Sequence, residues 1–145
     1  MLYKIVATVF FIGYFPFAPG TVCSAVVMIL LILLKPSYMV VSAILIISLV
    51  AGIVASERVQ KASNKKDPSY IVIDEFAGYL TSILFIPINW KNLLVAFILF
   101  RIFDIIKPPP IRQIEKKLKG GLGIMMDDII AGLITNILIR IFLML

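Results

Sequence analysis

The chain of 145 residues contains no histidine and only one cysteine. The lack of histidine excludes the commonest general base, the commonest zinc ligand and any phosphatase with a histidine nucleophile. The single cysteine, Cys23, excludes an internal disulfide, and residue 29 is Ile29 where a Cys-x5-Arg phosphatase loop needs arginine. No two aspartates have the Asp-x-Asp spacing that is usual in aspartyl-nucleophile phosphatases. Several common hydrolytic chemistries are therefore excluded.

Acidic residues are also scarce: there are eight, against fourteen basic residues, and the net charge is +6. Hydrophobic residues make up 61% of the chain, and the mean hydropathy is +1.08. Soluble domains are only about 45–50% apolar. The composition therefore predicts one all-α domain over residues 1–145, a polytopic membrane bundle of about four to five hydrophobic helices with short interfacial helices.

Proline, glycine or charge separates six apolar segments, at 2–18, 21–34, 38–55, 70–88, 92–106 and 124–145. The 38–55 and 124–145 segments approach the ~20 residues that a transmembrane helix needs. The 21–34 and 92–106 segments are shorter and need flanking residues or a thinner bilayer. The 2–18 segment ends in GYFPFAPG, which cannot continue a helix, so a spanning, a re-entrant and an interfacial position all stay open. It lacks a small-residue cleavage site, so we expect it to be retained.

Basic residues gather in two loops, 57–69 and 107–121, which hold nine of the fourteen Lys and Arg residues. The positive-inside rule places both loops in the cytoplasm. In the second loop, Ile111, Ile114 and Leu118 recur at helical spacing after three prolines. We expect a short amphipathic helix over 111–118 on the membrane surface, with a solvated loop as the alternative. The positive charge favours anionic membrane lipids or a phosphate as partners, rather than nucleic acid.

Five of the eight acids lie within or beside the apolar segments: Asp74, Glu75, Asp104, Asp127 and Asp128. An ionised carboxylate at mid-bilayer costs on the order of 3 kcal/mol, so these groups need water, a base or a cation. The predicted topology brings all five to the cytoplasmic interface. Carboxylate oxygens without histidine or cysteine suit Mg²⁺, so all five are candidate metal ligands and candidate catalytic groups. Capping of helix N-termini is the alternative for the two adjacent pairs.

Cationic and glycine-rich positions near these acids are candidates for binding a phosphate or a lipid headgroup. Arg101 shares a helix face with Asp104, either as an intrahelical ion pair or as a phosphate clamp. The other candidates are Thr21, Lys107, Arg112, Gly120 and Gly121. Thr21 and the two glycines precede apolar helices whose free N–H groups bind anions, although simple helix entry explains them as well. Deeper in the last segment, we expect Asn136 and Arg140 to make hydrogen bonds between helices and to snorkel to the interface.

Four motifs, in this order, resemble the phosphatidylglycerophosphatase A family: PFAPGTVCS (16–24), DPSYIVIDEFAGY (67–79), FRIFDIIKPPPIR (100–112) and GGLGIMMDDIIAG (120–132). The resemblance implies a Mg²⁺-dependent phosphatase of the bacterial inner membrane that removes the terminal phosphate of phosphatidylglycerophosphate and yields phosphatidylglycerol. It implies site residues at the following positions: Asp74, Glu75, Arg101, Asp104, Lys107, Asp127, Asp128 and the Pro19-Gly20-Thr21 turn. Cys23 stands where the family's turn usually has glycine, which argues against a role that needs a positive φ there.

Two other functions stay open. A small membrane cation transporter or channel would place acids at several membrane depths, whereas here they stand at one end of each segment. A lipid phosphotransferase would use the same site but pass the phosphate to a second headgroup. Neither the oligomeric state nor the carboxylate that acts as base or nucleophile follows from the sequence.

Overall fold

The computed structural model describes residues 1–65 and 68–144. Over these residues it contains seven α-helices, one 3-10 helix and no β-strand, which confirms the predicted all-α class. The elements are α1 (Leu2–Ala7), η1 (Ile12–Tyr14), α2 (Pro19–Leu34), α3 (Tyr38–Ser63), α4 (Ile73–Ser82), α5 (Trp90–Ile106), α6 (Ile111–Lys117) and α7 (Gly120–Met144).

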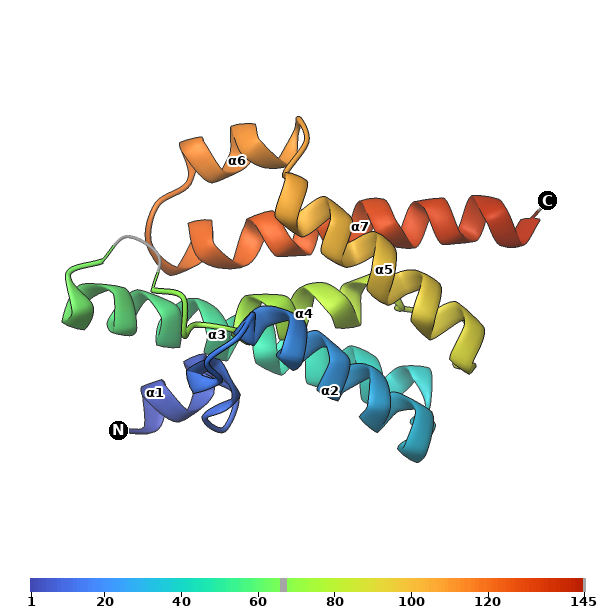
Figure 1. The fold of residues 1–145 in the computed structure, drawn as a ribbon, viewed down its shortest axis with the longest axis horizontal. Helices are drawn as coiled ribbons and strands as arrows, with labels where there is room; N and C mark the ends of the chain where they lie inside the picture. Colours follow the sequence, from blue (N-terminus) through green and yellow to red (C-terminus); the bar gives the residue numbers. More distant parts are fainter. Residues whose placement is uncertain (66–67, 145) are drawn as a thin grey trace.

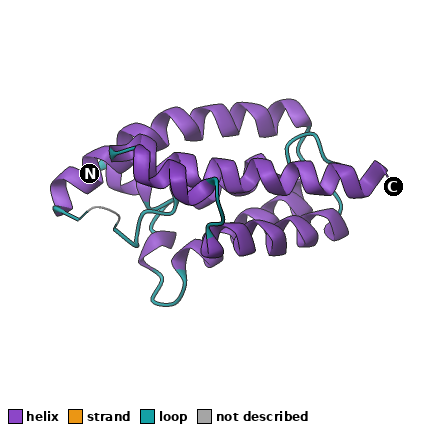
Figure 2. Cartoon of the chain, turned by 90° about the horizontal axis from the view of Figure 1, so that it is seen from above, coloured by secondary structure: helices purple, strands orange, loops and turns teal. Residues whose placement is uncertain are grey.

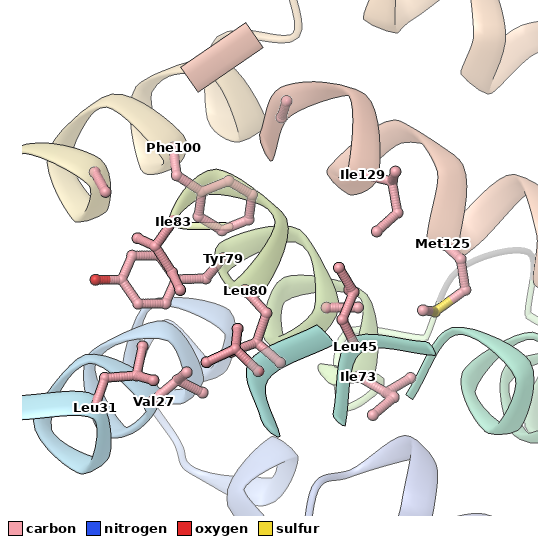
Figure 3. Packing of buried hydrophobic residues seen from close by; sticks show 14 of the residues in the cluster. Val27, Leu31, Leu45, Ile73, Tyr79, Leu80, Ile83, Phe100, Met125 and Ile129 are labelled. Atoms are coloured by element: carbon pink, nitrogen blue, oxygen red, sulfur yellow. The ribbon is translucent and has the colours of Figure 1, made fainter. Parts of the chain in front are cut away.

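The short helix α4 lies at the centre, and α2, α3, α5 and α7 pack around it (Figure 1). The long helices run roughly along one axis, and the two chain termini lie at opposite ends of the molecule (Figure 2). Tyr79 and Leu80 of α4 point into a core that includes Phe100 of α5 and Leu31 of α2 (Figure 3). This helix is buried on nearly every side, so its position is set by four neighbours at once.

Two glycines let α4 and α7 approach backbone to backbone. A Cβ on Gly132 would lie 2.3 Å from the carbonyl oxygen of Gly78, and a Cβ on Gly78 would lie 2.8 Å from the carbonyl oxygen of Asp128. Small residues allow such close contact between helices in apolar surroundings. The contact fixes the register of α7 on α4, and thereby the position of Asp128 beside the start of α4.

Among the described residues, α3 and α7 are the two helices long and apolar enough to cross a membrane, and α2 is a shorter apolar helix. With α5 and the short α4 they form the helical bundle, in agreement with the predicted four to five hydrophobic helices. The prediction for 70–88 needs correction, because α4 covers only 10 residues. A helix of this length measures about 15 Å, half the thickness of the hydrocarbon core.

Side chains from α7 donate hydrogen bonds to the carbonyl groups at the C-terminal end of α4. The amide Nδ2 of Asn136 donates to the carbonyl oxygens of Thr81, Ser82 and Leu84 at 3.2, 3.1 and 2.9 Å. Arg140 donates through Nη2 to Leu84 at 2.9 Å and through Nε to the Asn136 Oδ1 at 2.7 Å. The predicted hydrogen bonding between helices is therefore confirmed for Asn136, and it explains how α4 can end inside the bundle.

The two segments that the sequence left least certain are short helices joined by turns. Residues 2–18 do not form one helix: α1 ends at Ala7, and η1 follows a left-handed turn at Val9, Phe10 and Phe11. The predicted helix after the three prolines is confirmed as α6, with its first residue buried and Arg112 exposed. Its contact with a membrane surface stays a prediction.

Candidate active site

Segments from four helices and one connecting loop meet at a cavity of about 250 Å³. The wall comes from the start of α2, the segment before α4, the first turn of α4, the end of α5 and the third turn of α7. The lining residues are Ala18, Pro19, Gly20, Ser69, Ile71, Asp74, Glu75, Arg101, Asp104, Lys107, Asp127 and Asp128. All five carboxylates singled out in the sequence therefore face one space, together with two cationic side chains.

Three of the carboxylates form a tight group. Oxygens of Asp74, Glu75 and Asp128 lie within 4.8 Å of one another. One oxygen of each, Asp74 Oδ1, Glu75 Oε2 and Asp128 Oδ2, is inaccessible to solvent and has no hydrogen-bond partner. Buried polar atoms in folded proteins nearly always have a partner, so an orphaned set of this kind indicates a ligand. Three carboxylate donors without nitrogen or sulfur fit a hard divalent cation such as Mg²⁺.

The local sequence explains how the acids reach this position. Helix α4 begins at Ile73, so Asp74 and Glu75 occupy its first turn, where the helix dipole favours negative charge. Glu75 then reaches the start of α2 because Gly20 has no side chain: a Cβ there would lie 1.8 Å from Glu75 Oε1. The Pro19-Gly20 pair thus begins α2 and makes room for the carboxylate.

The other two carboxylates are paired with bases. Asp104 Oδ2 lies 2.5 Å from Arg101 Nη1 on the same face of α5, so the predicted intrahelical ion pair is present. Asp127 Oδ2 accepts a hydrogen bond from Lys107 Nζ at 2.5 Å, and its Oδ1 accepts from the backbone N–H of Asp128 at 3.1 Å. Arg101 also approaches Glu75 Oε1 at 3.9 Å. Its Nε is buried without a hydrogen-bond partner, so this donor is available to an anion in the cavity.

The cavity carries an excess of negative charge. Five carboxylates face two cationic side chains, which leaves a formal charge of −3 when all are ionised. Burial raises the pKa of Asp74 well above its usual range, and the neighbouring Glu75 and Asp128 carboxylates raise it further. Burial is also the main cause that raises the pKa of Glu75 to about 7. Without a cation, the site therefore holds protons that an ordinary carboxylate would release near pH 4.

Four residues that the sequence analysis placed at a phosphate do not line this cavity: Thr21, Arg112, Gly120 and Gly121. Gly121 packs against α3, since a Cβ there would lie 1.9 Å from the carbonyl oxygen of Ile53. Gly120 adopts a φ of +70° beside Glu57 at the start of α7. The structure thus explains both glycines by helix packing and turn geometry. Their predicted contact with a phosphate, and that of Thr21 and Arg112 with a headgroup, remains untested.

Three lining residues were not predicted as site residues: Ala18, Ser69 and Ile71. Ser69 and Ile71 belong to the segment that leads into α4, and the backbone N–H of Val72 donates to the carbonyl oxygen of Ala7 at 2.9 Å. Their place at the cavity depends on this pairing of distant segments, which has no periodic signal in the sequence. The available signal was their position inside two of the motifs, Ala18 in PFAPGTVCS and Ser69 and Ile71 in DPSYIVIDEFAGY.

Comparison with known proteins gives three related bacterial sequences. A Bacteroides thetaiotaomicron protein named "Putative phosphatidylinositol-3-phosphatase" is 37% identical over 146 residues, covering 94% of this chain and 91% of that protein. Phosphatidylglycerophosphatase A of Escherichia coli K12 is 33% identical over 85% of this chain and 73% of its own length. The Haemophilus influenzae protein of the same name is 46% identical over 50% of this chain and 45% of its own length.

No solved structure matches the chain significantly. The family model described as "Phosphatidylglycerophosphatase A" matches residues 5–143, which includes every residue that lines the cavity. The match agrees with the resemblance that the four motifs carry. The chain belongs to the phosphatidylglycerophosphatase A family.

Proposed function

We propose that this protein is a Mg²⁺-dependent lipid phosphatase that hydrolyses phosphatidylglycerophosphate to phosphatidylglycerol and inorganic phosphate. Membership of the family and the name of the Escherichia coli relative support the substrate. The observation that carries the chemistry is the group of three carboxylates with orphaned oxygens, beside two cationic side chains in one cavity. We place the enzyme in the bacterial inner membrane as a multi-pass protein, with its site at the cytoplasmic face.

Asp74, Glu75 and Asp128 would hold the metal. Mg²⁺ prefers one or two carboxylates together with waters and substrate phosphate oxygens, and this trio supplies donors from two helices. When bound, Mg²⁺ would supply Lewis-acid polarisation of the phosphoryl group. The positive charge would also relieve the mutual repulsion of the three carboxylates, which Arg101 offsets only in part from 3.9 Å away at Glu75.

Arg101 and Lys107 would bind the phosphate from the other side of the cavity. The buried Nε of Arg101 has no partner and can donate to an equatorial phosphate oxygen. Each cation is held by a carboxylate, Arg101 by Asp104 and Lys107 by Asp127, which fixes its position before substrate arrives. Preorganised donors of this kind stabilise the charge that develops on the phosphoryl oxygens during transfer.

Asp104 and Asp127 remain as the carboxylates that are not in the metal-binding group. One of them would accept a proton from water as its oxygen forms a bond to phosphorus and the bond to the lipid glycerol oxygen breaks. The leaving oxygen then takes up a proton and becomes the free hydroxyl of phosphatidylglycerol. Direct attack on phosphorus by a carboxylate, followed by hydrolysis of the acyl phosphate, would give the same products.

A second lipid substrate is favoured by one specific observation. The Bacteroides relative, which aligns with 94% of this chain, is named for phosphatidylinositol 3-phosphate. Both lipids present a phosphate monoester to the same metal and cations, so the site chemistry serves either one. The cavity volume of about 250 Å³ lies below the usual range for ligand pockets, which supports the smaller glycerol headgroup over an inositol ring.

The test is a phosphate-release assay with purified protein on phosphatidylglycerophosphate, phosphatidylinositol 3-phosphate and phosphatidic acid, each with Mg²⁺ and with EDTA. We expect Mg²⁺-dependent release that is fastest with phosphatidylglycerophosphate. Release from none of the lipids would refute the phosphatase, and full activity in EDTA would refute the metal. Transfer of labelled phosphate to added phosphatidylglycerol, without release, would instead support the phosphotransferase. Cation flux in proteoliposomes without hydrolysis would support the transporter, although five carboxylates around one cavity favour hydrolysis.

A further inference from the structure

The turn between α1 and α2 exposes a cluster of aromatic side chains next to the cavity. Phe10 is 81% exposed and Phe17 is 78% exposed, and Phe11, Tyr14 and Phe15 are about half exposed. Exposed aromatic clusters of this size mark surfaces that contact a partner or a membrane. We define residues 9–17 as the aromatic turn.

The aromatic turn has an uncommon backbone conformation that hydrogen bonds support. Val9, Phe10 and Phe11 all have a positive φ, at 45°, 53° and 71°. Thr8 holds the turn closed, because its Oγ1 accepts from the Phe11 N–H at 3.1 Å and its carbonyl oxygen accepts from the Gly13 N–H at 2.9 Å. Three consecutive left-handed residues other than glycine are unfavourable and persist only where the surrounding structure imposes them. Here their effect is to hold the Phe10 and Phe11 side chains at the surface.

The same turn is joined directly to the cavity wall. Gly13 touches the segment before α4, since a Cβ there would lie 1.9 Å from the carbonyl oxygen of Tyr70, and the Tyr14 ring stacks on Tyr70 with centroids 5.5 Å apart. The neighbours of Tyr70, Ser69 and Ile71, line the cavity, and the turn runs on into the lining residues at 18–20. Whatever surface receives the turn therefore also sets the position of the cavity mouth.

The charge pattern indicates which surface this is. The chain has no charged residue from 5 to 34, which includes the whole aromatic turn. Exposed cationic side chains stand close by at Lys4 of α1 and at Arg58, which shares an apolar groove with Tyr3 and Val6. Aromatic rings with flanking basic residues fit the boundary between acyl chains and anionic headgroups. A second protein copy would not need these flanking cations.

We propose that the aromatic turn inserts at the headgroup boundary of a bilayer containing anionic lipids, and so seats the mouth of the cavity at the level of lipid phosphates. Residues 2–18 are then interfacial, neither spanning nor re-entrant. The occupant of this surface is the lipid headgroup layer of the membrane that α3 and α7 would cross, so the inference rests on the membrane placement in the proposed function. The proposal does not depend on which phosphate monoester the enzyme hydrolyses.

The test measures the depth of single tryptophans in vesicles of phosphatidylcholine and phosphatidylglycerol. The one native tryptophan is removed by Trp90→Phe, and a single tryptophan is then introduced by Phe10→Trp or by Phe17→Trp. Phe17 does not have a positive φ, so the Phe17→Trp variant still tests the proposal if Phe10→Trp fails to fold. Ile137→Trp on the exposed face of α7 is the matched control for a deep position. Lipids brominated near the headgroup or near the chain end then quench tryptophans at shallow or deep positions.

We expect the turn tryptophans to be quenched most by the shallow bromines, and the control by the deep ones. Water-like emission without quenching would overturn the proposal, because the turn would then face solvent. Strongest quenching by deep bromines would show a re-entrant segment, and blue-shifted emission without any quenching would show a contact with a second protein copy. The measurement needs no catalysis, so an inactive preparation tests the turn as well as an active one.

Discussion

The two ends of α4 both meet polar side chains from α7, but in opposite states of hydrogen bonding. At the C-terminal end, the amide of Asn136 donates to three carbonyl oxygens, and Arg140 completes the network. At the N-terminal end, Asp74 and Asp128 each keep a buried oxygen without a partner. Burying a polar group is costly unless it is paired. The paired end therefore stabilises the helix, whereas the unpaired end costs stability, as the proposed metal site requires.

This comparison predicts a large loss of activity from the unpaired end. Asp74→Asn and Asp128→Asn should each lower turnover at saturating Mg²⁺ on the order of a thousandfold, because each removes a charge from the three carboxylates that would hold the metal. Both proteins should fold normally, since neutralising one of five crowded carboxylates relieves repulsion. Phosphate release on purified, monodisperse protein measures this. Near wild-type rates in both variants would show that the cavity is not the active site.

At the paired end the effect should fall on stability instead. Asn136→Ala leaves the carbonyl oxygens at the end of α4 without their donor, and should lower the free energy of unfolding by about 2 kcal/mol. The folded fraction should keep its turnover within about twofold. Asn92→Ala is the matched control, because its Nδ2 donates to a single carbonyl, that of Pro87, near the surface at 2.9 Å. Equal destabilisation by the two variants would remove the special role of Asn136.

The contact between Gly20 and Glu75 allows a subtler perturbation of the unpaired end. Gly20→Ala places a Cβ against Glu75 Oε1 and should push this carboxylate away from Asp74 and Asp128. Turnover should fall about tenfold, and it should respond more weakly to added Mg²⁺. Gly52→Ala is the control, since its Cβ would meet the flexible end of Met125 at 2.7 Å and Ile73 Cγ1 at 3.1 Å, but no carboxylate. If both variants had the same turnover, the space at Gly20 would have no catalytic importance.

The sequence predicted the unpaired end far better than the paired one. Ionisable groups in an apolar chain carry a large energetic penalty, so Asp74, Glu75 and Asp128 stand out without any knowledge of the fold. The C-terminal end of α4 does not stand out, because the residues from 83 to 88 are apolar and continue the segment without a break. The helix ends at Ser82, where the amide of Asn136 donates to its last carbonyl groups. Gly121 was a candidate for binding a phosphate because it precedes an apolar helix; the sequence did not predict its close contact with α3, and the phosphate contact stays a prediction.

The smallest predicted effect concerns pH and distinguishes the two ends once more. The pKa of Glu75 is raised by burial to about 7, above the 4.5 of an ordinary glutamate, and that of Asp74 is raised in the same direction. Between pH 4.5 and about pH 7, Glu75 keeps its proton in the folded state and has lost it in the unfolded state. The stability of the metal-free protein should therefore fall as pH rises from about 4.5 to about 7. Thermal unfolding in EDTA across this range measures the slope.

Mg²⁺ should reverse that trend, because it binds the deprotonated carboxylates and takes the place of the protons. At a hundred times its dissociation constant it adds about 2.7 kcal/mol to the stability of the folded state, and its apparent affinity should increase with pH up to about 7. Glu75→Gln should flatten both dependences, whereas Asn136→Ala should shift the whole stability curve without changing its slope, since no titrating group is lost at that end. A pH slope that survives in Glu75→Gln and Asp74→Asn alike would mean that the excess protons are bound elsewhere than at the start of α4.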